Sequence, residues 1–147
     1  MANILIVDDS VTIAKFVEEI LLKAGHSVSL AVDAVDADRR LSATKFDLII
    51  LDIVMPGKNG FQLCRELKNH PQFGRIPIII MSTKNTEVDR YWGRKQGADD
   101  YLGKPCEPGI LLAAVRRLVP PPAAPASQPV EPQKSAERGF FGRFGFR

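Results

Sequence analysis

Short apolar runs alternate with amphipathic segments along most of this chain. The runs end at Asp, Ser or Gly, and between them apolar residues recur every three or four positions. The first pattern is typical of strands buried on both faces of a sheet, and the second is typical of helices that cover such strands. The predicted strands are 3–7, 26–31, 48–51, 76–81 and 99–102, and the predicted helices follow them at 10–24, 33–41, 60–67, 85–96 and 108–118.

Residues that start and stop helices stand at the expected places. Ser10 or Asp9 can cap the first helix, and Gly25 follows its last apolar residue. Asp33 opens the second helix, and Pro108 begins the last one. A strand–helix unit repeated five times implies parallel pairing through right-handed crossovers. We therefore predict an α/β fold with a doubly wound, five-stranded parallel sheet and helices on both faces.

Composition divides the chain into three parts. Residues 1–119 have the pattern of one globular domain, whereas residues 120–138 contain six prolines among Ala, Ser, Gln and Glu and are typical of an extended linker. Residues 139–147 form a third part, because four of the eight phenylalanines fall within these nine residues. Nine residues are too few for a helix-turn-helix, so we expect output through protein contacts or through this tail and not through DNA binding.

Charge and cysteine content limit the functions and the cellular compartments that fit this sequence. The net charge of the whole chain is +3, and residues 1–119 alone are close to neutral. A nearly neutral globular part argues against a nucleic-acid-binding domain. The two cysteines, Cys64 and Cys106, lie far apart and suggest neither a metal knuckle nor a disulfide framework. The sequence shows no apolar run long enough to span a bilayer and no signal peptide. We expect a cytoplasmic protein.

Polar residues that could bind a metal or take part in a reaction follow four of the predicted strands. These residues are Asp8 and Asp9, Asp52, Ser82 and Thr83, and Lys104. All strands of a parallel sheet end at one edge, where ligands bind in open α/β sheets, so these side chains should converge. Carboxylate oxygens suit a hard cation such as Mg²⁺. A carboxylate beside such a metal can attack a phosphoryl donor and form an aspartyl phosphate, with Lys104 neutralising charge.

Each of these residues also has a simpler explanation when taken alone. Asp8 and Asp9 can serve as an acidic pair at a helix N-terminus, Lys104 as a solvated loop lysine and Ser82 as a helix cap. Asp52 can cap the turn that follows its strand. Their common placement at one sheet edge favours a shared function.

The same residues resemble a known family. Asp8-Asp9, Leu51-Asp52 with Met55-Pro56-Gly57 and Gly60, Ser82, and Lys104-Pro105 look like the receiver domain of two-component response regulators, over residues 2–118. The resemblance implies the flavodoxin-like strand order 2-1-3-4-5. It makes Asp52 the phosphoacceptor for a histidine kinase or phosphotransfer protein. The chain is then a self-phosphorylating signalling protein that acts on a downstream protein target, not an enzyme.

The resemblance also implies a role for each neighbouring residue. Asp9 would bind Mg²⁺ directly, Asp8 would support it, and Asp52 and the Val54 carbonyl would complete the protein's ligands. Lys104 would contact the phosphoryl oxygens, and its bond to Pro105 is expected to be cis. On phosphorylation the Ser82 hydroxyl would turn towards Asp52, Tyr101 would turn inward, and the helix at 85–96, the last strand and the last helix would present a changed face.

The resemblance also implies that two positions, Val54 and Lys84, tune the lifetime of the phosphorylated state. The Val54 side chain cannot hydrogen-bond an attacking water, which predicts slower self-dephosphorylation than in members of that family with a polar residue at this position. The segment 87–98 is similar to regulators of chemotaxis-like systems that control type IV pilus twitching motility. Its Trp92 can pack on the sheet or lie on the output face.

Three other functions remain open at this point. An aspartyl-phosphate phosphohydrolase of the haloacid-dehalogenase type would need a second Asp where Val54 stands. A nucleotide-binding domain would need a Gly-rich turn in place of the acidic pair after the first strand. A receiver that acts unphosphorylated as a scaffold is the third. For the tail, docking to a protein is preferred over an anionic membrane surface, single-stranded nucleic acid or no role.

Overall fold

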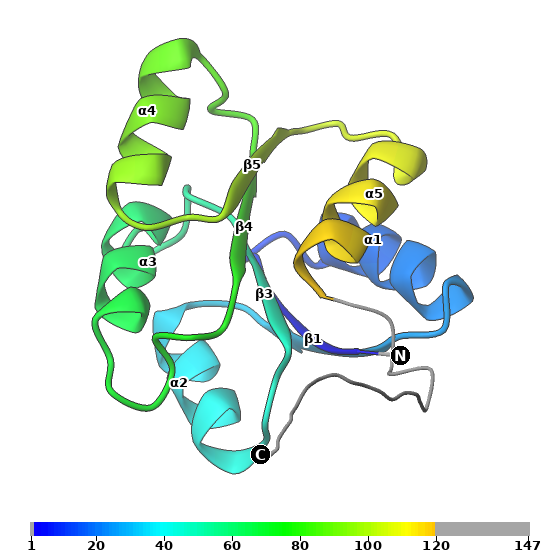
Figure 1. Cartoon of the computed structure of the whole chain (residues 1–147), viewed down its shortest axis with the longest axis horizontal. Coiled ribbons are helices and arrows are strands. Elements are labelled where there is room, and N and C mark those ends of the chain that lie inside the picture. Colours follow the sequence, from blue (N-terminus) through cyan, green and yellow to red (C-terminus); the bar gives the residue numbers. More distant parts are fainter. Residues whose placement is uncertain (1, 120–147) are drawn as a thin grey trace, which may run out of the picture.

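The structure of the protein is a computed structural model, and it describes residues 2–119. Five strands alternate with five helices, as the hydrophobic pattern predicts (Figure 1). The strands are β1 (Asn3–Val7), β2 (Ser27–Ala31), β3 (Leu48–Leu51), β4 (Ile78–Ser82) and β5 (Asp100–Gly103). The helices are α1 (Val11–Lys23), α2 (Ala34–Ala43), α3 (Gly60–Lys68), α4 (Glu87–Lys95) and α5 (Pro108–Leu118). The predicted linker (120–138) and tail (139–147) lie outside the described residues.

The strands form one parallel sheet in the order β2-β1-β3-β4-β5. Helices α2, α3 and α4 cover one face, and α1 and α5 cover the other (Figure 1). The expected strand order and the doubly wound arrangement are therefore confirmed.

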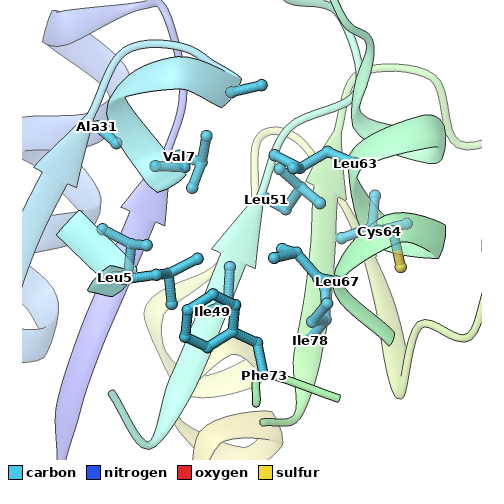
Figure 2. Packing of buried hydrophobic residues seen from close by; sticks show 14 of the residues in the cluster. Leu5, Val7, Ala31, Ile49, Leu51, Leu63, Cys64, Leu67, Phe73 and Ile78 are labelled. Atoms are coloured by element: carbon cyan, nitrogen blue, oxygen red, sulfur yellow. The ribbon is translucent and has the colours of Figure 1, made fainter. Parts of the chain in front are cut away.

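Each central strand is buried on both of its faces. Along β3, all four residues from Leu48 to Leu51 are buried, and alternate side chains enter opposite cores. Ile49 and Leu51 pack with α2 and α3, in the core that Figure 2 shows. Leu48 and Ile50 pack with α1 and α5. This double burial explains why the strands are continuous apolar runs with no polar alternation.

Local capping sets most of the helix boundaries. Ser10, Asp33 and Asn59 cap α1, α2 and α3 by accepting backbone N–H groups. Helix α4 begins at Glu87 and not at residue 85, because Thr86 and Asp89 form a reciprocal capping box. At the other end of α1, Gly25 has a φ of +95°, a conformation that glycine adopts without strain.

Helix α1 departs from a simple amphipathic helix. Its buried stripe is Ala14, Val17 and Leu21. Ile13 and Phe16 also fall on the three- or four-residue apolar spacing of this helix, but their exposed fractions are 37% and 57%. The apolar surface is therefore wider than the contact with the sheet requires, and the excess faces solvent.

No helix between residues 2 and 119 combines the length and apolar character that crossing a bilayer requires.

Candidate functional site

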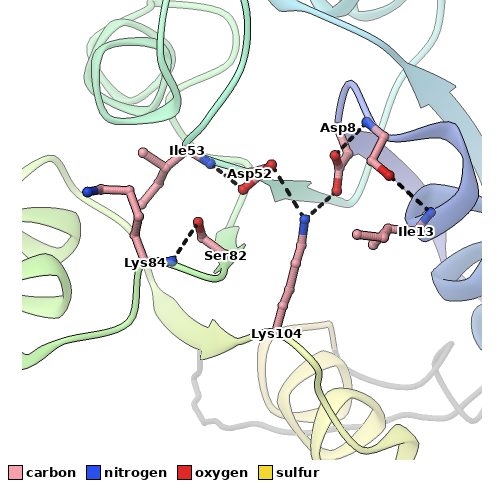
Figure 3. Close-up of polar contacts among 8 residues, drawn as sticks. Asp8, Ile13, Asp52, Ile53, Ser82, Lys84 and Lys104 are labelled. Carbon is pink, nitrogen blue, oxygen red and sulfur yellow. Dashed lines mark hydrogen bonds and ion pairs between the residues drawn. The ribbon is translucent and has the colours of Figure 1, made fainter.

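The carboxyl ends of four strands bring the predicted site residues together. The register pairs Val7 with Leu51 across β1 and β3, so Asp8 and Asp52 leave the sheet side by side. On the other side, Ser82 pairs with Gly103 across β4 and β5, directly before Lys104. Figure 3 shows Asp8, Asp52, Ser82 and Lys104 around one small region.

The backbone holds Asp52 at the end of β3. Its N–H donates to the carbonyl of Val7 at 2.9 Å, and its Oδ1 accepts the N–H of Ile53 at 2.7 Å. The chain then returns so closely that a Cβ on Gly60 would lie 2.1 Å from the Asp52 carbonyl oxygen. Glycine is therefore required at position 60 for the loop after Asp52 to close over it.

Lys104 links the two buried carboxylates. Its ammonium lies 2.6 Å from Oδ2 of Asp8 and 3.4 Å from Oδ2 of Asp52 (Figure 3). The side chains of the three residues are only 5–10% exposed. Because buried charges are costly unless paired, the ammonium stabilises both carboxylates but offsets only part of their negative charge. The Lys104–Pro105 peptide bond is cis, as expected, and the Lys104 N–H donates to the carbonyl of Ser82.

Asp8, Asp9 and Asp52 could hold a divalent cation. Each residue offers one carboxylate oxygen, and these three oxygens lie within 4.8 Å of one another. Asp8 and Asp52 are buried, whereas Asp9 is exposed, so the cluster opens to solvent on one side. An oxygen-only set beside water fits Mg²⁺, which retains several waters when bound to protein. Val54 follows with its side chain 56% exposed, and its carbonyl remains a predicted ligand.

Ser82 and Tyr101 meet at the backbone of Lys84. The buried Ser82 hydroxyl oxygen accepts the Lys84 N–H at 3.2 Å, and the Tyr101 hydroxyl donates to the Lys84 carbonyl. Burial, with a contribution from the charge of Asp89, raises the pKa of Tyr101 to about 12. Tyr101 is 1% exposed, so its ring already lies in the inward position that the resemblance associates with phosphorylation.

Residues 4–116 match the response regulator receiver domain. The chain belongs to the response regulator receiver family. Receiver domains are phosphoacceptor switches of two-component phosphorelays, bind Mg²⁺ in an acidic pocket, and interact with histidine kinases and downstream targets.

This receiver domain is similar to two curated proteins of Pseudomonas aeruginosa. It is 43% identical to protein PilH over 119 residues, which is 81% of this chain and 98% of PilH. It is 38% identical to protein PilG over 80% of this chain and 87% of PilG. Among solved structures, the chemotaxis protein CheY4 of Vibrio cholerae matches 80% of this chain and 98% of its own, at 33% identity and a TM-score of 0.75.

Sequence reasoning missed two residues that position Tyr101 in this receiver domain. The Arg90 guanidinium donates to the Tyr101 carbonyl at 3.0 Å and lies 5.5 Å from the ring centroid. Gly93 leaves the space that the ring occupies, because a Cβ there would lie 2.6 Å from the ring's Cδ2. A glycine within the predicted helix was the available signal for this close approach.

Trp92 lies on the surface of the receiver domain. Its side chain is 49% exposed, and its ring makes an edge-on contact with Tyr91. Of the two placements left open by the sequence, packing on the sheet or exposure on the output side, the structure favours exposure.

Proposed function

We propose that Asp52 accepts a phosphoryl group from a histidine kinase or phosphotransfer protein and that the modified domain controls a protein partner. The main support is the juxtaposition of Asp52 with the Lys104 ammonium and the carboxylates of Asp8 and Asp9. A carboxylate oxygen of Asp52 forms the new P–O bond while the donor's P–N bond breaks and the histidine nitrogen leaves.

Lys104 and Ser82 are the groups of this chain that would receive the transferred phosphoryl oxygens. The ammonium of Lys104 already contacts Asp52, so it can neutralise oxygen charge without a large movement. In this proposal Asp8, Asp9, Asp52 and the Val54 carbonyl hold Mg²⁺, which supplies further charge neutralisation when bound.

The switch would pass through Lys84. A phosphoryl group adds strong acceptor oxygens, and the Ser82 hydroxyl can turn to donate to one of them. Turning would release the Lys84 N–H, and the opposite side of the same residue accepts the Tyr101 hydroxyl. We infer that the loop between β4 and α4 then shifts, which alters the face formed by α4, β5 and α5.

We propose motility control through a chemotaxis-like system as the process. This proposal is supported by the resemblance of residues 87–98 to twitching-motility regulators and by the similarity to PilH, PilG and CheY4. For residues 139–147 we propose docking on a protein surface, because four phenylalanines in nine residues can act as hydrophobic anchors.

Intact mass spectrometry tests the phosphorylation chemistry. We expect a phosphoryl adduct after incubation with Mg²⁺ and a small acyl phosphate, and loss of the adduct in Asp52→Asn and on chelation. Steady turnover of a phosphate ester would instead assign the chain to the aspartyl-phosphate hydrolases. Absence of any adduct in the native chain would favour the unphosphorylated scaffold.

A further inference from the structure

An apolar groove lies between α1 and the segment that joins β5 to α5. Its volume is about 410 Å³. Ile13, Phe16 and Ile20 of α1 form one wall, and Pro105, Cys106 and Leu111 form the other. We call it the α1 groove. Its volume lies within the range of pockets that bind compact ligands.

The α1 groove explains the unusual surface of α1. Phe16 and Ile13 belong to the apolar periodicity of the helix but are 57% and 37% exposed, because they line the groove instead of the core. Adjacent exposed apolar side chains around a hollow mark an interaction site more often than single ones do. The lining offers an occupant hydrophobic contact almost throughout, which suits aromatic side chains.

The same chain carries a matching segment. Helix α5 ends at Leu118 and covers the same face of the sheet as α1 (Figure 1). Residues 120–138 follow, and a Pro-rich chain spans about 3 Å per residue, so the linker can reach roughly 60 Å. The 11 residues of α5 measure only about 17 Å at 1.5 Å per residue. Residues 139–147 can therefore return along α5 to the groove.

We propose that residues 139–147 dock in the α1 groove of their own receiver domain through phenylalanine side chains. Because residues 120–138 tether the tail to the domain, the local concentration of the tail at the groove is of order 1 mM. With a contact whose dissociation constant is about 0.1–1 mM, the groove is occupied half of the time or more, yet remains open to competitors.

The position of the groove gives this docking a consequence for phosphotransfer. Thr83 and Lys104 also line the groove, so a docked tail lies next to the region around Asp52. A protein donor that approaches Asp52 from this side would have to displace the tail. This consequence rests on the proposed function, whereas the docking itself does not.

Cys106 provides a probe that is already in the groove. It is partly exposed, while the second cysteine, Cys64, is fully buried. The rate at which iodoacetamide alkylates Cys106 in the full chain, followed by intact mass and peptide mapping, therefore reports occupancy without any phosphorylation. The test variant replaces the four tail phenylalanines, Phe140, Phe141, Phe144 and Phe146, with serine.

We expect Cys106 to react about two- to tenfold faster in the tail variant than in the native chain. This range follows from the local concentration and the dissociation constants given above. The rate difference should be independent of protein concentration. In a Phe16→Ser background the tail substitutions should have little further effect, because both act on one contact. Val35→Ser on the opposite face is the matched control and should leave the native rate unchanged, since Val35 is 72% exposed.

Equal Cys106 rates in the native chain and the tail variant would overturn the proposal. So would protection that disappears on dilution, which would assign the groove to a second copy of the chain. Equal rates combined with tail-dependent binding to anionic phospholipid vesicles would move the tail to a membrane surface and equally contradict docking in the groove.

Discussion

Lys104 sets the electrostatic balance of the site at the scale of single residues. One ammonium contacts two buried carboxylates that would otherwise repel each other. The third carboxylate, Asp9, faces solvent. The single ammonium offsets only part of the negative charge of the buried carboxylates, and the side with Asp9 is the one from which a cation or donor can enter.

A substitution of Val54 tests what limits the lifetime of the phosphorylated state. Its exposed side chain follows Asp52 by two residues and has no hydrogen-bonding group. In Val54→Asn, an amide could hold an attacking water through a hydrogen bond worth about 1 kcal/mol, which corresponds to roughly fivefold faster loss of phosphate. The measurement is the decay of the Asp52 adduct by intact mass after removal of the donor. Val54→Ala is the control, and an unchanged decay in the Asn variant would show that Val54 does not limit hydrolysis.

Helix α4 is held to the sheet at few points. Val88, Tyr91 and Trp92 are all about half exposed or more, and the one fully buried position of the helix is Gly93. The Tyr101 ring packs directly against this glycine. A glycine costs about 1 kcal/mol of helix propensity relative to alanine, so its presence here is explained by the room that the ring needs.

Gly93→Ala should therefore destabilise the domain even though alanine favours helix. The added Cβ would lie 2.6 Å from a ring carbon, and we expect a loss of about 1–3 kcal/mol in the free energy of unfolding, as for overpacked cores. Urea unfolding measures the loss, and the ring resonances of Tyr101 should shift. Gly109→Ala in α5 is the matched control, because nothing lies within 4 Å of its added Cβ. A Gly93→Ala domain as stable as the native one, with Tyr101 unmoved, would contradict this account.

At the scale of the whole molecule, a contact at the amino ends of the strands adds to the stability that the two hydrophobic cores provide. At the edge opposite the site, the N–H of Ala2 donates to Nδ1 of His26 at 3.0 Å, which joins the start of β1 to the segment before β2. A protonated imidazole could not accept this hydrogen bond. Burial lowers the pKa of His26 below its ordinary value of 6.5.

This shift predicts a pH dependence of global stability. Because the folded-state pKa is lowered, the unfolded chain binds the proton more tightly. The contribution of His26 is fully present above about pH 6.5 and is lost as the pH falls through the folded-state pKa. We expect the urea midpoint to fall more between pH 7.5 and 5.5 in the native chain than in His26→Asn, which retains an acceptor. Equal decreases in both proteins would show that His26 does not contribute.

Most of the fold could be predicted because its signals are local. Apolar runs such as 48–51 mark doubly buried strands, and the strand ends place Asp8, Asp52, Ser82 and Lys104 at one edge. The inward Tyr101 and the exposed Phe16 could not be predicted from periodicity, because both depend on which helix packs beside them. The contacts of the Lys84 backbone could not be predicted either, because any residue type offers the same backbone N–H and carbonyl.

The ion pair between Lys104 and Asp8 joins residues that are 96 positions apart in the sequence. During synthesis, a ribosome releases β1 and β3, and with them every carboxylate of the site, well before Lys104 appears. A nascent or prematurely terminated chain therefore carries Asp52 without the cation that completes its surroundings. If Asp52 is the phosphoacceptor, as proposed, phosphorylation would thus require a nearly complete domain.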